Sequence, residues 1–453
     1  MKKILAWPAP LLQKWLLSLL LCAVLALFCA TTAQAAGVSI TLTASEYALH
    51  YAFDAGAQDP FVILEYATPA EKGWMMLYSE DGRFEGDIAL AYSGAGGKTS
   101  VALTSARTTG SIGKASTTLP KAADYQKPTG KSNAKVTDFV LTETPEGFHY
   151  AFNAAGTDYM LLYWRSKEQT VTQPVYPDEN GHYEGDVISD LTFARTQFTV
   201  QVKSGSGSMK KEATVRKGYQ APEAPQRQEG RLSGVTVCID AGHQENGRFV
   251  NEPIGPGLSG STSGKGGMAQ GTKTNRRESI VCLEIGMLLR DELLRQGANV
   301  IMTREDQTTF HTNIERCEIA EAGGAQIMLR LHCNNSSNRS KRGIQVYGPL
   351  NSDYAKAVAD ADTYREMGQK LLDAMKTRVG MTLANSTGMV RLNDNYVGNN
   401  WAKMMCFLVE MGYLSNPAEE YLLVTPVYQQ WLAEGMADGV YEIAVARGWV
   451  QAQ

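Results

Sequence analysis

The hydrophobic pattern of the chain changes near residue 231, and this change divides the molecule into two unlike halves. Before it, segments such as "SITLTAS" and "FVILEYA" alternate apolar and polar residues between turn pairs such as Asp81-Gly82. After it, apolar runs such as "VTVCID" and "CFLVEMG" alternate with helical patterns. The first pattern is typical of all-β structure, and the second predicts a twisted, mostly parallel α/β sheet flanked by helices. We place the α/β domain at 233–453, after a Pro-, Gln- and Glu-rich linker at 220–232.

The front half contains an internal duplication. "LTASEYALHYAFDAG" matches "LTETPEGFHYAFNAA", and "DGRFEGD" matches "NGHYEGD", both at an offset of 99 residues. Short strands with turn pairs at this spacing are typical of β-sandwiches. We therefore predict two tandem sandwich-like repeats, at 36–125 and 126–219.

Two polar features recur in both copies. His50 and His149 occupy equivalent positions beside a tyrosine, and we expect partly buried strand histidines rather than ligands. The shared "EGD" is expected to end a strand at a turn. Its two acids per copy offer few of the six to eight oxygen ligands that calcium requires.

The N-terminus has the pattern of an export signal. A basic start precedes an uncharged apolar run from Leu16 to Ala30, and small residues end in Ala33-Gln34-Ala35. This order predicts a secretory signal peptide at 1–35. An uncleaved anchor is the alternative, but the run is short for a membrane span of about 20 residues. We find no other apolar stretch long enough to cross a membrane, so no span is expected after cleavage.

Charge and cysteine usage exclude several classes of function. The net charge of −4 gives no basic face for nucleic acid. An odd number of cysteines follows the signal, none in a C-x-x-C pair, which favours buried thiols over a disulfide framework or a thiolate zinc site. These are Cys238, Cys282, Cys317, Cys333 and Cys406.

Four residues at strand or helix ends of the α/β domain form a candidate site. His243 follows the first strand, Glu278 opens the next helix, His332 ends "IMLRLH", and Glu410 ends "CFLVE". Open α/β sheets place their chemistry at such junctions. Two imidazoles and a carboxylate suit Zn²⁺ with a fourth position left to water, and a second carboxylate beside the metal can carry protons.

Taken one at a time, these residues also have structural explanations. Either histidine can be an ordinary core residue, and Glu278 can be a first-turn acid favoured by the helix dipole. Glu410 is the hardest to explain this way, because a carboxylate that closes an apolar run needs a compensating partner.

The same four segments resemble the zinc-dependent N-acetylmuramoyl-L-alanine amidases. "VCIDAGH" is similar to the family's opening strand, and "RRESIVCLEIGMLLRDELLRQGANVIMTR" to its Glu-led helix and following strand. "LRLHCNNS" resembles its His-x-Asn signature and "FLVEMGYLSNPAEE" its Val-Glu-x-Gly segment. The resemblance covers about 234–449 and implies His243, Glu278 and His332 as ligands of one zinc ion, with Glu410 as the catalytic carboxylate.

The resemblance also implies a substrate and a location. The family hydrolyses the amide between N-acetylmuramic acid and L-alanine in peptidoglycan, in cell-wall turnover, autolysis or cell separation. A secreted protein of the cell envelope, in the periplasm or the cell wall, is then expected. The front repeats lie outside the resemblance. Two tandem β-modules on a secreted protein suggest adhesion, spacing or substrate targeting, so we expect them to bind the cell wall or another envelope component.

The chain departs from the family pattern in three places, of which the mildest is Cys333, where a small residue is usual. Gln244 stands where more glycine is usual, and a Gly/Ser-rich loop at 255–271 separates two of the candidate ligands. We expect this loop to be a flexible wall or lid of the groove. It is not a phosphate loop, because the spacing is one residue short and no Ser or Thr follows the lysine.

Two other functions stay open from the sequence. One is a cell-wall-binding protein with an inactive amidase-like domain, which would bind sacculi without cleaving them. The other is a zinc peptidase that cuts within the stem peptide, which the masses of the products distinguish.

Overall fold

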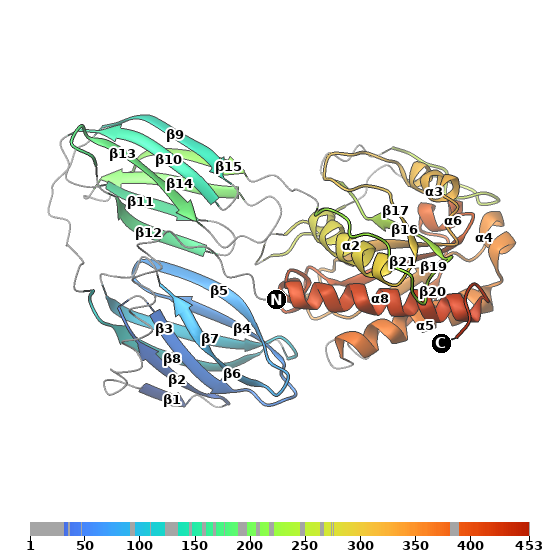
Figure 1. Ribbon diagram of the computed structural model, residues 1–453, viewed down its shortest axis with the longest axis horizontal. Coiled ribbons are helices and arrows are strands. Elements are labelled where there is room, and N and C mark those ends of the chain that lie inside the picture. The colour runs from blue at the N-terminus through green and yellow to red at the C-terminus, as the bar shows by residue number, and fades with distance from the viewer. Residues whose placement is uncertain are drawn as a thin grey trace. The chain divides into compact units, whose positions relative to one another are not determined.

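The chain forms two compact units, Met1–Gly218 and Tyr219–Gln453, in a computed structural model (Figure 1). No helix among the described residues is both long and apolar enough to span a bilayer. Except for Thr31–Gln34, the described part of the chain does not include the predicted signal peptide. The described residues are 31–34, 37–46, 48–90, 96–108, 110–122, 135–144, 147–155, 160–165, 169–175, 177–188, 197–204, 209–216, 222–244, 250–262, 267–272, 274, 276–380 and 389–452.

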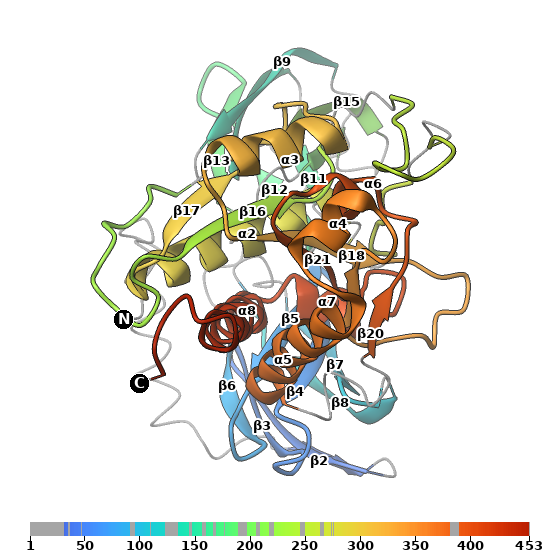
Figure 2. The same ribbon diagram turned by 90° about the vertical axis from the view of Figure 1, so that its right-hand side faces the viewer.

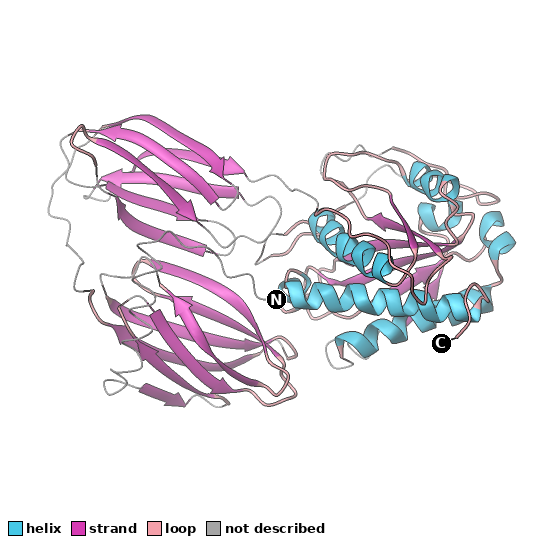
Figure 3. Cartoon of the chain, viewed as in Figure 1, coloured by secondary structure: helices cyan, strands magenta, loops and turns pink. Residues whose placement is uncertain are grey.

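The described residues of the N-terminal unit form β-strands and loops only (Figure 3). The strands are β1 (Thr31–Gln34), β2 (Ser39–Ala44), β3 (Ala48–Asp54), β4 (Phe61–Ala67), β5 (Glu71–Tyr78), β6 (Arg83–Ala89), β7 (Gly97–Ser105), β8 (Ser111–Leu119), β9 (Val136–Thr144), β10 (Gly147–Ala154), β11 (Met160–Arg165), β12 (Gln169–Val175), β13 (His182–Ile188), β14 (Gln197–Ser204) and β15 (Met209–Arg216).

Antiparallel pairing joins these strands into three sheets. The orders are β1-β2-β3-β6, β13-β10-β9 and β15-β14-β11-β12-β5-β4-β7-β8. Buried side chains gather in two hydrophobic clusters, one around Leu42 and Leu64 and the other around Phe148 and Trp164. The front half is therefore rich in antiparallel β-structure with two separate cores. The tandem duplication itself stays a prediction from the sequence.

The two "EGD" segments lie inside β6 and β13, so the expectation that they end strands at turns is wrong. Gly86 pairs with Tyr51 across β3 and β6, and Gly185 pairs with Tyr150 across β10 and β13. A Cβ atom on either glycine would lie 2.7 Å from the hydroxyl oxygen of the paired tyrosine. The glycine is needed because the tyrosine ring crosses the neighbouring strand at that point.

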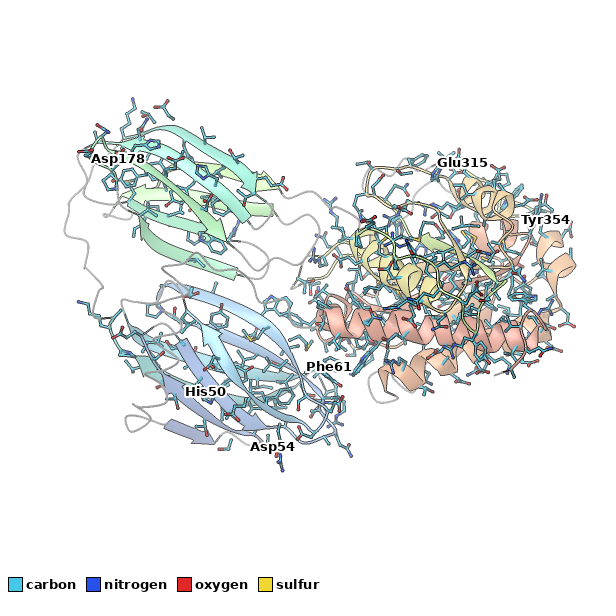
Figure 4. The ribbon with its side chains drawn as sticks, in the orientation of Figure 1. His50, Asp54, Phe61, Asp178, Glu315 and Tyr354 are labelled. Atoms are coloured by element: carbon cyan, nitrogen blue, oxygen red, sulfur yellow. The ribbon has the colours of Figure 1, made fainter. Side chains whose placement is uncertain are left out.

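His50 and His149 are half-buried strand residues, as expected, and Figure 4 labels His50 on β3. Nδ1 of His50 lies 3.1 Å from Oδ1 of Asp87, and Nδ1 of His149 lies 2.9 Å from Oδ1 of Asp186. Each histidine is also the direct register partner of its aspartate. Such cross-strand pairs stabilise antiparallel sheets.

The C-terminal unit alternates strands with helices. Its strands are β16 (Thr236–Ala241), β17 (Asn299–Met302), β18 (Ile327–Asn334), β19 (Gln345–Gly348), β20 (Met389–Leu392) and β21 (Met405–Tyr413). Its helices are α2 (Glu278–Arg295), α3 (Asn313–Ala322), α4 (Asp353–Val358), α5 (Ala361–Val379), α6 (Val397–Trp401), α7 (Glu419–Leu423) and α8 (Pro426–Ala446).

The sheet of this unit is mixed, in the order β17-β16-β18-β21-β19-β20. Four of its pairings are parallel, but β19 runs antiparallel to β21, and β20 follows the direction of β19. The predicted mostly parallel sheet is therefore corrected at these two strands. The segment between β18 and β19 contains no helix, so the chain returns in the opposite direction without a crossover.

Helices cover both faces of the sheet (Figure 2). On one face α2 packs against β16, β17 and β18, α5 packs against β19 and β20, and α8 packs against both helices. On the other face α3 and the segment after α6 enclose a cluster that includes Cys317 and Cys406. The helical pattern over 353–379 is divided into two helices, α4 and α5, because the chain is extended at Ala359 and Asp360 caps a new helix.

A buried carboxylate lies at the centre of this unit. Asp240, near the end of β16, is fully buried and accepts hydrogen bonds from Thr303 at 2.8 Å, from Arg330 at 2.9 Å and from Arg316. Burial alone would raise the pKa of Asp240, but the two guanidinium groups hold it well below its usual range. The aspartate therefore stays charged, and its charge is compensated on both oxygens.

The described part of the predicted linker, 222–232, belongs to the C-terminal unit and hydrogen-bonds to its helix α2. The carbonyl of Pro222 accepts from Arg290 at 3.0 Å, and the N–H of Gln228 donates to the carbonyl of Leu294 at 3.0 Å. Both partners lie on α2, so this stretch is held along that helix.

Asp240→Ala is expected to lower the free energy of unfolding of the C-terminal unit by about 3–5 kcal/mol, because it leaves two buried guanidinium groups uncompensated. Scanning calorimetry of the full chain measures the effect on that unit's transition. Glu321→Ala is the matched control, because its pair with Lys403 is exposed and contributes about 0–1 kcal/mol. Equal losses for the two variants would contradict the assigned role of Asp240.

Candidate metal centre

His243 follows the end of β16 in a constrained turn. The N–H of Gly242 donates to the carbonyl of Leu331 at 2.9 Å, and a Cβ atom at Gly242 would lie 2.5 Å from that oxygen. Only glycine allows this close approach to β18. His243 itself has a φ of 58°, in the left-handed region that few side chains adopt. The turn places its imidazole beside the end of β18.

Two buried arginines hold this turn by its backbone. Arg304 donates to the carbonyls of Ala241 at 2.8 Å and Gly242 at 2.9 Å. Arg316 donates to the carbonyls of Ala241 at 2.9 Å and His243 at 3.2 Å. Arg304 and Arg316 are only 2% and 3% exposed. Both arginines therefore stabilise the turn rather than contact a substrate.

Glu278 is the first residue of α2, and four groups surround its carboxylate. Its Oε1 lies 3.1 Å from Nε2 of His243 and 3.0 Å from Nδ1 of His332. Backbone N–H groups of Cys333 and Ala269 donate to its two oxygens at 3.1 Å and 2.7 Å. Burial opposes its charge, but the contacts with the two histidines outweigh burial and lower the pKa of Glu278.

His332, near the end of β18, completes the group. Its ring lies 4.9 Å from the ring of His243, at 81°. Burial is the main cause that lowers the pKa of His332, so the neutral imidazole that binds metals is favoured. Its Nε2 is buried and has no hydrogen-bond partner among the described residues.

These three side chains converge, although 35 and 54 residues of sequence separate them from one another. One candidate ligand atom from each of His243, Glu278 and His332 lies within 4.8 Å of the others. Within the described ranges, no other trio of His, Cys, Asp or Glu meets this criterion. A divalent cation fits this donor set, because two imidazoles and a carboxylate are ligands that Zn²⁺ accepts and the buried Nε2 lacks a protein partner.

Glu410 lies on the neighbouring strand β21, as the register partner of His332. Its Oε2 is buried and has no hydrogen-bond partner among the described residues. Burial, and then the nearby charge of Glu278, raise the pKa of Glu410 to about 8. The four residues singled out from the sequence therefore lie together at one edge of the sheet.

The described part of the Gly/Ser-rich loop hydrogen-bonds to the rest of the unit, because the carbonyl of Pro256 accepts from the N–H of Asp353 at 2.9 Å. Immediately before the loop, two carbonyl oxygens accept hydrogen bonds from residues of α6. Pro253 accepts from Trp401 at 2.9 Å, and Ile254 accepts from Asn400 at 3.1 Å. Just before it, the carboxylate of Glu252 accepts N–H groups from the start of α3. The segment that leads into the loop is therefore hydrogen-bonded to α3 and α6. The role of the loop at 255–271 as a flexible wall or lid stays a prediction from the sequence.

The cysteines behave as predicted for the described residues, where all five are free and buried. Two other features of the site were missed. Asp240 lay inside an apolar run, where a buried charge was a usable signal. Gln345 opens "QVYG", and only the register of β19 against β21 brings it opposite Glu410.

Comparison with known proteins finds relatives of the C-terminal unit. Residues 237–442 match the family model described as N-acetylmuramoyl-L-alanine amidase. The germination-specific N-acetylmuramoyl-L-alanine amidase of Bacillus subtilis is 26% identical over 231 residues, 48% of this chain and 83% of that protein. The probable cell wall amidase LytH of Staphylococcus aureus is 27% identical over 218 residues, 47% of this chain and 60% of that protein.

Solved structures with similarity to the same half of the chain include two amidases. The N-acetylmuramoyl-L-alanine amidase from Clostridium difficile 630 is 24% identical, with a TM-score of 0.37, over 46% of this chain and 96% of that one. The amidase Ami1 from Mycobacterium abscessus is 19% identical, with a TM-score of 0.42, over 47% of this chain and 99% of that one. From its family match and its relatives, the C-terminal unit of this chain belongs to the N-acetylmuramoyl-L-alanine amidase family.

Proposed function

We propose that the C-terminal unit is a zinc hydrolase that cleaves the amide between N-acetylmuramic acid and L-alanine in peptidoglycan. The observation that carries the proposal is the convergence of His243, Glu278 and His332, with Glu410 on the adjacent strand. The family match identifies the bond that would be cut. The four side chains would provide the metal site and the group that carries the proton.

His243, Glu278 and His332 would hold the ion. A zinc ion in such a site lowers the pKa of bound water towards about 7 and polarises a carbonyl group. The protein fixes the ligands in advance: Arg304 and Arg316 hold the turn that carries His243, and backbone N–H groups orient the carboxylate of Glu278. Little rearrangement is then needed on binding.

Glu410 would carry the proton. Burial keeps its carboxyl out of bulk water, and no protein hydrogen bond occupies Oε2 among the described residues. We assign it to accept a proton from the attacking water and to deliver it to the nitrogen of the leaving L-alanine. A cation nearby favours the charged carboxylate, which is the form that accepts the proton.

We further propose that the protein is secreted and acts in the cell envelope, in the periplasm or the cell wall. The predicted signal peptide and an extracytoplasmic substrate support this location. The front β-structure would bind the cell wall or another envelope component and direct the amidase to it.

Removal of zinc is expected to abolish release of peptides from purified sacculi, and added Zn²⁺ is expected to restore it. His243→Ala should lose both bound zinc and activity, because two ligands rarely retain the ion. His311→Ala is the control, because this histidine lies outside the metal group.

Product masses must show a free lactyl carboxylate and a new L-alanine amino terminus. Cuts elsewhere in the peptide would indicate a peptidase, and sacculus binding without cleavage at any zinc concentration would indicate an inactive binding protein.

Glu410→Gln is expected to keep bound zinc and to lower kcat by about 10²–10⁴-fold, because the amide cannot accept a proton. Steady-state kinetics and metal analysis of the same preparation measure the two effects. Glu305→Gln, an exposed carboxylate of the same unit, should change neither. Normal turnover by Glu410→Gln would show that another group carries the proton.

A further inference from the structure

A row of side chains crosses the sheet at the candidate metal centre and continues past Glu410. Glu410 on β21 is the register partner of His332 on one side and of Gln345 on the other. Residues directly opposite on antiparallel strands project from the same face, with Cβ atoms about 4.5–5.5 Å apart. Gln345 therefore lies one strand beyond Glu410, on the face that carries the site.

The hydrogen bonds around Gln345 fix which way its amide points. Its Oε1 accepts from the hydroxyl of Tyr347 at 2.6 Å and from Nδ2 of Asn334 at 3.2 Å. Asn334 cannot be turned around, because its Oδ1 accepts from the backbone N–H of Asn335 at 2.8 Å. A backbone N–H can only donate, so the sequence of donors and acceptors sets the orientation of both amides.

The nitrogen of Gln345 is therefore the end of the amide left for other partners. Burial raises the pKa of Tyr413, and a hydrogen bond from Gln345 opposes that rise, so one N–H faces this hydroxyl. A primary amide nitrogen carries two protons. Among the described residues no acceptor is found for the second, and Gln345 is partly exposed.

Aromatic side chains border this amide. The rings of Tyr347 and Tyr396 lie 5.1 Å apart at 61°, and Tyr347 and Tyr413 are nearly buried. A free N–H among aromatic walls suits a carbonyl oxygen. The neighbouring carboxylate of Glu410 disfavours an anionic group at the same place, so an uncharged carbonyl is the better match.

We propose that Gln345 is a substrate-binding residue, which donates its free N–H to an uncharged carbonyl oxygen of the substrate close to the amide that is cut. Asn334 and Tyr347 are positioning residues, because they act by holding the amide of Gln345. The inference rests on the proposed amidase function and adds a subsite to it.

Gln345→Leu and Gln345→Glu test the donated hydrogen bond. Leucine removes the amide, whereas glutamate keeps its size but replaces the N–H by an acceptor. Each variant is expected to raise KM for an N-acetylmuramoyl-L-alanyl peptide by about tenfold, with unchanged zinc content. Gln326→Leu is the matched control, because Gln326 accepts from Thr236 at the opposite edge of the same sheet. It should leave KM unchanged.

Asn334→Asp tests the orientation separately. Aspartate still accepts from the N–H of residue 335, but it turns a second acceptor towards Gln345 and should reverse that amide. We expect the same rise in KM, whereas a purely structural role would change the melting temperature alone.

The outcomes separate this inference from the function on which it rests. If the wild-type enzyme with zinc releases no L-alanyl peptide, the proposed function fails. If it does so and Gln345→Glu keeps the wild-type KM, or loses only kcat, the carbonyl subsite is wrong and the amidase assignment stands.

Discussion

The geometry of the C-terminal unit depends on the buried charge of Asp240. This carboxylate is buried away from solvent, and it stays charged only because two guanidinium groups and a hydroxyl bind its oxygens. One of these groups, on Arg316, also binds the backbone carbonyl of His243. The same network that compensates a buried charge thus sets the position of a candidate metal ligand. Such a network is rigid, because loosening any member leaves a charge unpaired in a medium of low dielectric constant.

Much of the candidate site could be predicted from the sequence, because its residues follow apolar strands that are easy to recognise. His332 and Glu410 each end such a run, and parallel neighbours bring these ends to one edge. Spacing alone could not show that Glu278 lies beside both imidazoles. The order of the motifs, which resembles that of the amidase family, made the set of three ligands a specific expectation. The partners of Asp240 could not be predicted, because Arg316 and Arg330 come from separate elements whose packing only the folded structure defines.

The errors have equally particular causes. The residues of an apolar strand do not indicate whether it runs parallel or antiparallel to its neighbour. The antiparallel direction of β19 could therefore not be predicted from "GIQVYG". Glycine and aspartate are common in turns, which made "EGD" resemble a strand end. In the structure this glycine leaves room for the ring of a tyrosine on the neighbouring strand. The arrangement occurs in both halves of the front unit, at Tyr51 and at Tyr150. Stacked rings also recur there, between Phe53 and Phe84 and between Phe152 and Tyr183.

Because β19 runs in the reverse direction, strands of both directions border the edge that carries the candidate site. Strands β16, β18 and β21 arrive there with their carboxyl ends, whereas β19 departs from it. The connection at 335–344, which contains none of the candidate metal ligands, therefore opens directly onto the same edge. A change in its length would reshape the border of this edge, while β16, β18 and β21, which position His243, His332 and Glu410, would keep their places in the sheet.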